Sequence, residues 1–179
     1  MVLKGLSRKL LHKTEAGAVL LDLWEEAAVR KAVAAISENM RRAGLQEPLE
    51  GFLVCEQIRG GIELAFGVQR DPEMGAVVMA GSGGVLLELM RDVGFAPLPL
   101  TPQRARKLIE RLRIARLLHG YRAGPAHDFE ALAQALMAVA RLAQDLGDAL
   151  VAIDVNPVVT RPGQPPVALD AVVVLRGGA

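Results

Sequence analysis

Residues 149–174 read ALVAIDVNPVVTRPGQPPVALDAVVV, and this stretch carries the strongest structural signal in the chain. Two apolar runs, Ala149 to Val155 and Pro166 to Val174, have the composition of short strands. The turn-forming residues Pro162-Gly163-Gln164 lie between them, which predicts a hairpin. We expect this hairpin to bring three oxygen-bearing side chains to one end and one face of a sheet: Asp154, Asn156 and Asp170.

These side chains suit a magnesium ion, because Mg²⁺ prefers oxygen ligands and keeps coordination positions for phosphate oxygens. A magnesium site of this kind usually indicates nucleotide chemistry. The alternative is that Asp154-Val155-Asn156-Pro157 is only a turn, since Asn and Asp cap turns and Pro fixes the backbone angle. The metal interpretation gains support from other elements of a nucleotide site upstream.

The composition is that of a folded globular protein. The 179 residues suffice for one domain or two small lobes, and a hydrophobic fraction of 51% argues against a disordered chain. The formal net charge of +1 gives no overall attraction to nucleic acids or anionic membranes. Aromatic residues make up only 3%, which leaves little for stacking on bases. We therefore expect no nucleic-acid partner.

The cellular setting is predicted from the cysteine content and the N-terminus. Cys55 is the only cysteine, so no internal disulfide forms, and its place in a strand-like run favours a small core residue over a nucleophile. The start of the chain lacks the apolar segment of a signal peptide, and no stretch approaches a membrane span. We expect a cytoplasmic protein without a membrane partner.

Helical and strand-like patterns predict an α/β (α+β) protein with mixed or antiparallel sheets flanked by helices. Helices are expected over Glu25–Ala43, Thr101–Leu112 and Phe129–Leu146, with Thr101 and Asp128 as N-caps. The expected short strands are Val2–Lys4, Ala18–Leu23, Gly51–Glu56, Ile62–Gln69, Gly75–Ala80 and Val85–Met90.

A second group of candidate residues lies near the N-terminus. Lys4 ends a strand just before a loop that contains His12, Lys13, Thr14 and Gly17. Backbone donors, ammonium groups and a glycine that allows close approach are features of a phosphate-binding loop. The alternative is an ordinary exposed lysine beside a solvated loop.

Glu56 and Glu63 flank a Gly60-Gly61 turn, which predicts a hairpin with a carboxylate near each strand end. Such a carboxylate can hold the hydroxyl pair of a ribose, although a solvated strand end is the alternative for either residue. Gly81-Ser82-Gly83-Gly84 is either a flexible turn or a loop that faces phosphate or a partner.

A basic helix face offers a third possibility. Arg104, Lys107 and Arg111 share one face of the helix expected from Thr101. A solvated outer face is the simpler interpretation. The functional interpretation is an oligomeric structural protein whose basic helix binds an acidic partner.

In their order, these segments resemble the ATP-grasp domain of the ADP-forming (NDP-forming) acyl-CoA synthetases, relatives of succinyl-CoA synthetase. The resemblance covers nearly the whole chain. The matching segments are Val2-Leu3-Lys4, Ser7, His12-Lys13-Thr14-Glu15-Ala16-Gly17, Phe52 to Glu56, Gly60 to Leu64, Gly67-Val68, Arg70-Asp71-Pro72, Val77 to Val85, Asp92-Val93, Asp154 to Pro157 and Leu169-Asp170-Ala171.

The resemblance implies ATP or ADP with Mg²⁺, held between two β-rich lobes. Lys4 would contact phosphate and the loop from His12 through Lys13 and Thr14 to Gly17 would cover it. Glu56 would lie on the adenine side, with Glu63 toward the ribose. Asn156 and Asp170 would hold Mg²⁺, with Asp154 close behind. In this family, phosphate passes between ATP and a histidine of a partner domain, and onward to an acyl phosphate and CoA.

The resemblance also predicts the domain organisation. Residues 1–46 would be a remnant of the small lobe, with several dozen family residues missing before Lys4, and residues 47–179 the main lobe. Ala18 stands where a second glycine is common, and Ser82 where an apolar residue is usual. We expect a domain or subunit that is inactive alone, forms a homo-oligomer, and acts with CoA-binding and phosphohistidine-bearing partners. The alternative is a non-catalytic nucleotide-binding or regulatory module, as in fusions to acetyltransferases.

Overall fold

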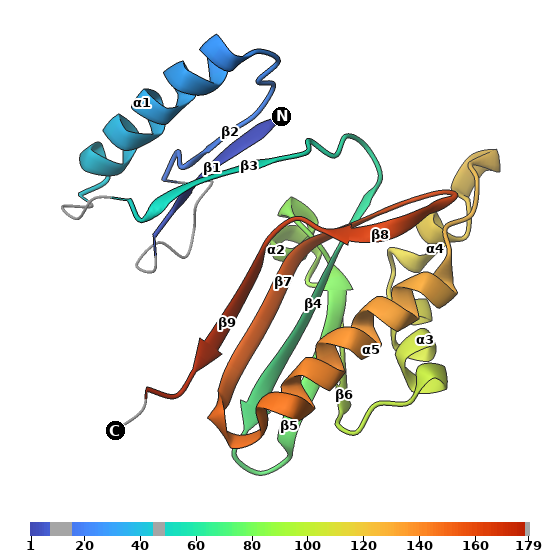
Figure 1. Cartoon of the computed structure of the whole chain (residues 1–179). Helices are drawn as coiled ribbons and strands as arrows, with labels where there is room; N and C mark the ends of the chain where they lie inside the picture. Colours follow the sequence, from blue (N-terminus) through green and yellow to red (C-terminus); the bar gives the residue numbers. More distant parts are fainter. Residues whose placement is uncertain (8–15, 45–48, 178–179) are drawn as a thin grey trace. The chain divides into compact units, whose positions relative to one another are not determined.

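The computed structural model describes residues 1–7, 16–44 and 49–177, which fall into two compact units (Figure 1). The units span Met1–Arg59 and Gly60–Ala179, and each is described by itself. The break expected between lobes, near Glu47 and Pro48, lies outside the described residues. The predicted lobes of residues 1–46 and 47–179 therefore stay a prediction.

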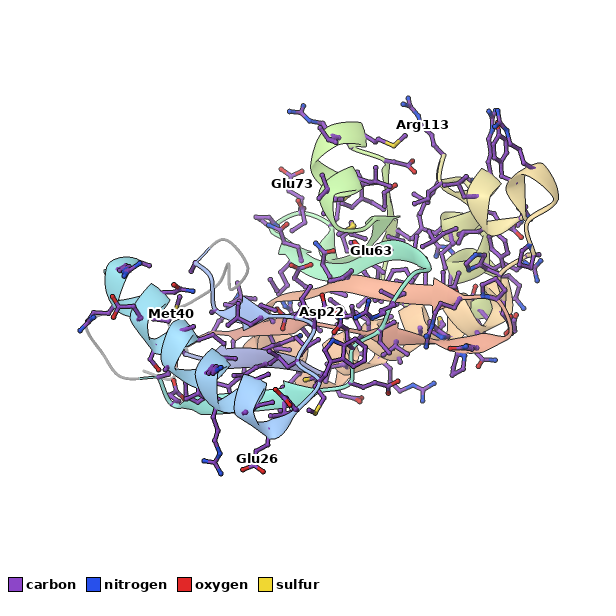
Figure 2. The ribbon with its side chains drawn as sticks, turned by 90° about the horizontal axis from the view of Figure 1, so that it is seen from above. Asp22, Glu26, Met40, Glu63, Glu73 and Arg113 are labelled. Atoms are coloured by element: carbon purple, nitrogen blue, oxygen red, sulfur yellow. The ribbon has the colours of Figure 1, made fainter. Side chains whose placement is uncertain are left out.

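The first unit is a small antiparallel sheet with one long helix. Its strands, in the order β2-β1-β3, are β1 (Val2–Leu6), β2 (Val19–Leu20) and β3 (Gly51–Cys55), and the helix is α1 (Glu26–Arg42). Met40 is a buried residue of α1, whereas the exposed Glu26 points away from the helix (Figure 2). The core of this unit comprises Leu3, Ala18, Leu23, Ala32, Ile36 and Met40.

The second unit is an antiparallel sheet in the order β6-β5-β4-β7-β8, with β9 paired to β7. The strands are β4 (Ile62–Asp71), β5 (Gly75–Ser82), β6 (Val93–Pro97), β7 (Leu150–Arg161), β8 (Gln164–Ala168) and β9 (Ala171–Leu175). The helices are α2 (Val85–Met90), α3 (Pro102–Glu110), α4 (Ala115–Leu118) and α5 (Phe129–Leu146), with 3₁₀ turns η1 (Tyr121–Ala123) and η2 (Gly147–Ala149).

Side chains of the central strand β4 show how this sheet is layered. Leu64, Phe66 and Val68 are buried in the main core with residues of α3 and α5. Gly67 and Gln69, at the alternate positions, line a pocket on the opposite face. One face of the sheet is therefore covered by helices, and the pocket lies on the other face.

The predicted long helices are confirmed, including their caps. The Asp128 Oδ1 accepts hydrogen bonds from Glu130 N and Ala131 N at 2.9 and 3.0 Å. The Thr101 hydroxyl accepts one from Arg104 N at 3.3 Å. Each cap satisfies backbone N–H groups that lack a partner inside the helix.

Two local predictions are wrong. The apolar run Val85–Met90 is a short helix, because Gly84 has a φ of 55° and begins it at the end of β5. A short apolar run does not distinguish a helix from a strand by periodicity. Gly51–Cys55 and Ile62–Asp71 do not form a hairpin, since β3 pairs with β1 while β4 pairs with β5 and β7.

The predicted C-terminal hairpin is confirmed in outline but differs in detail. Its first strand is longer than expected and extends through Arg161, and its second strand is divided at Leu169 and Asp170 into β8 and β9. Both halves pair with β7. In the sequence, the single charged residue Asp170 interrupts the apolar run at the division. In the part of the chain that is described, no helix has the length and apolarity required to cross a bilayer.

Candidate functional site

The three predicted metal ligands lie together at the division between β8 and β9. Asp154 and Asn156 are two residues apart on β7, and Asp170 lies between the two strands that pair with β7. The Asn156 N–H donates to the Asp170 carbonyl at 3.2 Å. The fold therefore holds the backbone of Asp170 directly beside Asn156.

The electrostatics of this cluster come from two neighbouring carboxyl groups. Partial burial raises the pKa of Asp154 above its ordinary value, and the negative charge of Asp170 raises it further. The negative charge of Asp170 beside the partly buried Asp154 makes this a place where a cation is favoured. The amide oxygen of Asn156 adds a third hard donor to this set.

The donor set fits magnesium. It has two carboxylates and one amide oxygen, which are ligand types that Mg²⁺ accepts while retaining positions for water or phosphate oxygens. Within residues 1–7, 16–44 and 49–177, no cluster of three or more His, Cys, Asp or Glu side chains suits a metal. The candidate centre thus depends on Asn156 as the third ligand.

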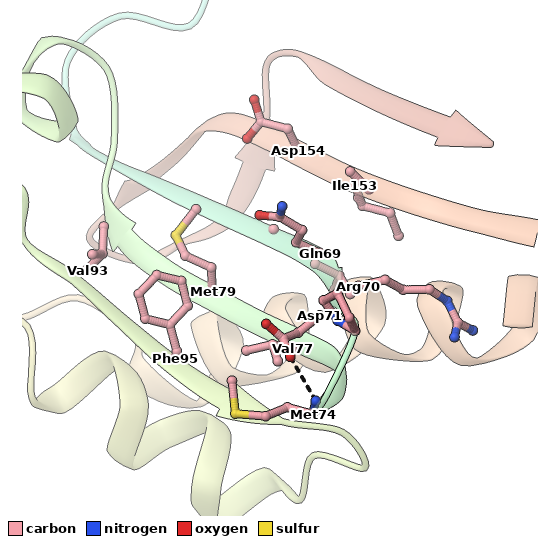
Figure 3. Close-up of a pocket in the computed structure, with 14 residues that line it drawn as sticks. Gln69, Arg70, Asp71, Met74, Val77, Met79, Val93, Phe95, Ile153 and Asp154 are labelled. Atoms are coloured by element: carbon pink, nitrogen blue, oxygen red, sulfur yellow. Dashed lines mark hydrogen bonds between the residues drawn. The ribbon is translucent and has the colours of Figure 1, made fainter. Parts of the chain in front are cut away.

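A cavity of about 740 Å³ adjoins this cluster on the open face of the sheet (Figure 3). Asp154 belongs to its wall, together with Gln69 on β4. Much of the remaining lining is apolar and includes Met79 and Phe95. A charged group at the edge of an apolar hollow is the usual arrangement of a small-molecule site.

The predicted phosphate residues lie in the first unit, as far as they are described. Lys4 pairs with Val19 and Leu53 in the middle of the three-stranded sheet. Gly17 has a φ of 68°, and its carbonyl accepts a hydrogen bond from Asn39 Nδ2 at 3.0 Å. An added Cβ at Gly17 would lie 2.8 Å from that nitrogen, so the loop requires glycine there. His12, Lys13 and Thr14 lie outside the described residues.

Glu56 and Glu63 belong to different units, so the hairpin that was expected to join them is absent. Glu56 is exposed and follows β3. Glu63 lies on β4, and its Oε2 is only 1.9 Å from the place that a Cβ on Gly84 would occupy. The roles of Glu56 on the adenine side and Glu63 at the ribose stay predictions. That Lys4 and the C-terminal carboxylates bind the same nucleotide also stays a prediction.

One contact of the cluster was not anticipated from the sequence. Asn156 Oδ1 accepts a hydrogen bond from the Gly84 N–H at 3.1 Å. The sequence predicts either a flexible turn or a functional loop at Gly81–Gly84, but it does not specify the partner of this loop in the fold. The two residues are far apart in sequence, and only the pairing of β4 with both β5 and β7 brings them together.

The ATP-grasp domain model matches residues 1–175. The chain belongs to the ATP-grasp family. The β subunit of ADP-forming acetate–CoA ligase II from Pyrococcus furiosus is 34% identical to this ATP-grasp chain over 178 residues, 99% of the chain and 75% of the subunit. Acetate–CoA ligase I (ADP-forming) from Archaeoglobus fulgidus is 35% identical over 158 residues, 88% of the chain but only 23% of that protein. The ATP-grasp chain thus belongs to the branch of the ADP-forming acyl-CoA ligases, as the resemblance implied.

Solved structures agree with this assignment. Dinucleotide-forming acetyl-coenzyme A synthetase 1 from Ca. Korarchaeum cryptofilum, in complex with coenzyme A, Ca-AMPCP and HgCl⁺, has a TM-score of 0.91 and 38% identity to the ATP-grasp chain. The match covers 98% of the chain and 76% of that structure. A second structure of that synthetase, with coenzyme A and Mg-AMPPCP, has its phosphohistidine segment pointing towards the nucleotide-binding site. Its TM-score is 0.82 and its identity 35%, over 98% of the chain and 76% of that structure. The predicted fold class of mixed α/β with antiparallel sheets is confirmed.

Acidification tests the carboxylate pair directly. We expect the Asp154 carboxyl group to titrate above its ordinary pKa, and an Asp170→Asn substitution to lower that pKa because it removes the neighbouring negative charge. Because cation binding requires the ionised form, affinity for Mg²⁺ should fall as the pH drops through the raised pKa. Carboxyl ¹³C NMR of the full chain, with and without Mg²⁺, measures both effects. An Asp154 midpoint that is the same in wild type and in Asp170→Asn would contradict the proximity of the two groups.

Proposed function

We propose that this chain binds Mg-ATP or Mg-ADP and provides the nucleotide site of an ADP-forming acyl-CoA synthetase. The reaction of such an enzyme converts an acid, CoA and ATP to acyl-CoA, ADP and phosphate. The observation that carries the proposal is the grouping of Asp154, Asn156 and Asp170 at the division between β8 and β9. Membership of the family and the nucleotide analogues in related structures support it.

In the proposal, Asn156 and Asp170 hold the cation and Asp154 adds negative charge close behind them. A bound Mg²⁺ offsets phosphate charge and aligns the reacting oxygens. The carboxylates keep the ion at a fixed place on a rigid strand pair, which limits the reorganisation needed at the site. Lys4 and the loop through Gly17 are proposed to contact the phosphates. Glu56 is proposed to lie on the adenine side of the nucleoside, and Glu63 is proposed to contact the ribose.

The proposed partners are CoA-binding and phosphohistidine-bearing domains or subunits, in a complex that also includes further copies of this chain. Two of the histidines, His119 and His127, contact other side chains of this chain. His119 stacks on Phe129 with ring centroids 4.4 Å apart, and His127 Nδ1 lies 3.2 Å from Thr160 Oγ1. A phosphate-accepting histidine supplied by a partner is therefore part of the proposal.

Titration calorimetry of the full chain with Mg-ADP and Mg-ATP tests the proposal. We expect a binding heat that disappears when EDTA removes Mg²⁺, because the carboxylates then repel the phosphates. AMP serves as the control ligand, since it lacks the phosphates that the cation would bridge. Absence of heat with both nucleotides would contradict the proposal.

Addition of a related phosphohistidine-bearing subunit and radiolabelled ATP separates the two functional classes. Transfer of label to that subunit supports the synthetase. Nucleotide binding without transfer favours the non-catalytic module.

A further inference from the structure

The loop Gly81–Gly84 comprises the end of β5 and the turn into α2, and it contacts Asn156 of the candidate metal centre. Besides the bond from Gly84 N–H to Asn156 Oδ1, the Gly83 N–H donates to the Glu63 carbonyl at 2.8 Å. The loop is thereby attached to two strands, β4 and β7. Its position determines where the Gly84 N–H points.

A buried carboxylate anchors the other end of this loop. Asp92 is 8% exposed, and its Oδ2 accepts hydrogen bonds from Ser82 Oγ at 3.0 Å and Ile114 N at 2.9 Å. Its Oδ1 accepts another from Arg113 N at 2.8 Å. The Ser82 N–H also donates to the Asp92 carbonyl at 2.9 Å. Ser82 is therefore bound to Asp92 through both its side chain and its backbone.

The packing leaves the loop little freedom to move away from this anchor. A Cβ on Gly81 would lie 2.9 Å from the Asp92 carbonyl oxygen, and one on Gly83 would lie 2.5 Å from the Leu64 carbonyl oxygen. Both distances are shorter than real Cβ contacts, so the loop backbone lies directly on its neighbours. Ser82 itself is fully buried, and its hydroxyl is satisfied by Asp92.

The bond from Gly84 matters because only one end of the Asn156 amide can bind a cation. The Gly84 N–H is a donor, so the atom that faces it is the oxygen, which has two lone pairs and can serve a cation as well. Without this donor, the amide is free to turn its NH₂ group toward the metal. Groups that orient metal ligands in this way have large effects on metal affinity.

We propose that Asp92 and Ser82 are positioning residues for the cation, acting through the Gly84 N–H to hold the Asn156 oxygen in place. The proposal rests on the proposed function, since it concerns the same metal centre. The family resemblance predicts an apolar residue at the position of Ser82. The positioning role gives a reason for a buried serine there, since its hydroxyl donates to Asp92.

The test uses the full chain and Mn²⁺ as a paramagnetic probe. Asn39 and Asn156 are the only asparagines, so labelling with ¹⁵N-asparagine gives two side-chain amide signals that an Asn156→Ala spectrum assigns. In Ser82→Ala and Asp92→Asn, we expect the Asn156 side-chain signals to shift in the metal-free protein. We also expect the Mn²⁺ dissociation constant, measured by electron paramagnetic resonance, to rise about tenfold.

Two variants are matched controls. Asp128→Asn alters a carboxylate that also accepts two backbone N–H bonds, and Ser37→Ala removes a hydroxyl that also donates one hydrogen bond, to the Val33 carbonyl. Both are expected to keep the Asn156 signals and the Mn²⁺ dissociation constant of the wild type.

The outcomes separate this inference from the proposed function. If wild type binds no Mn²⁺, the proposed function fails. If wild type binds Mn²⁺ but Ser82→Ala and Asp92→Asn bind equally well with unchanged Asn156 signals, the positioning role is overturned and the proposed function stands.

A further measurement does not depend on the folding of these variants. The Gly84 amide should exchange with solvent faster in Asn156→Ala than in wild type, because its acceptor is lost. An unchanged exchange rate overturns the inference.

Discussion

Replacement of Asp170 by alanine is expected to weaken binding of Mg-ADP by about 100-fold or more, because changes to groups behind metal ligands already cost about 10- to 100-fold. The substitution removes one of the two carboxylates of the proposed centre and leaves only the carboxylate of Asp154, which lies close behind the ligands. Titration calorimetry of the full chain, with and without Mg²⁺, measures the loss. The difference between the two conditions should largely vanish in the variant.

Asp145→Ala is the matched control for this experiment. Asp145 is an exposed carboxylate on α5, the helix that packs on the covered side of the sheet. We expect it to bind Mg-ADP like the wild type. If Asp170→Ala and Asp145→Ala bind equally well, the cation does not bind at the division between β8 and β9.

Replacement of Phe66 by alanine is expected to lower the free energy of unfolding of the second unit by about 3–5 kcal/mol. Phe66 lies in the middle of β4 with no exposed surface and belongs to the core beneath α3 and α5. Its truncation removes apolar contacts and leaves a cavity that the surrounding strands fill only in part. Denaturant unfolding followed by circular dichroism measures the change.

Phe95→Ala provides the same chemical change on the other face of the same sheet. Phe95 is 64% exposed on β6 and lines the pocket. Its truncation should change the unfolding free energy by only about 0.5 kcal/mol, as is usual for surface positions. Equal losses in the two variants would contradict the assignment of covered and open faces, and with it the position of the pocket.

The metal ligands illustrate what could be read from local sequence. The pattern from Asp154 to Pro157, with Asp170 after the turn at Gly163, predicts a hairpin with neighbouring polar side chains, and the structure has one. This succeeded because the turn is short and the strands are adjacent in the chain. The capped helices α3 and α5 were predictable for the same reason, since capping involves residues within one turn.

The errors arose where a local pattern has two physical solutions. Val85–Met90 is apolar throughout, so its periodicity fits a strand or a helix, and the positive φ of Gly84 selects the helix. The two glutamates Glu56 and Glu63 flank a good turn, but the strands on either side find better partners in different sheets. Strand pairing depends on distant segments, which a local pattern does not specify.

The sequence by itself determined the family, the mixed α/β class and the identity of the candidate cation ligands, because these depend on ordered motifs and on contacts between near neighbours. Only the tertiary structure decided that Gly84 fixes the amide of Asn156 and that Asp92 anchors the loop that carries it. The contact between Gly84 and Asn156 forms because β4 lies between β5 and β7, which brings together residues that are 72 positions apart in the chain. Burial of polar groups in such a place requires complete hydrogen bonding, and that requirement is met only when the fold is assembled.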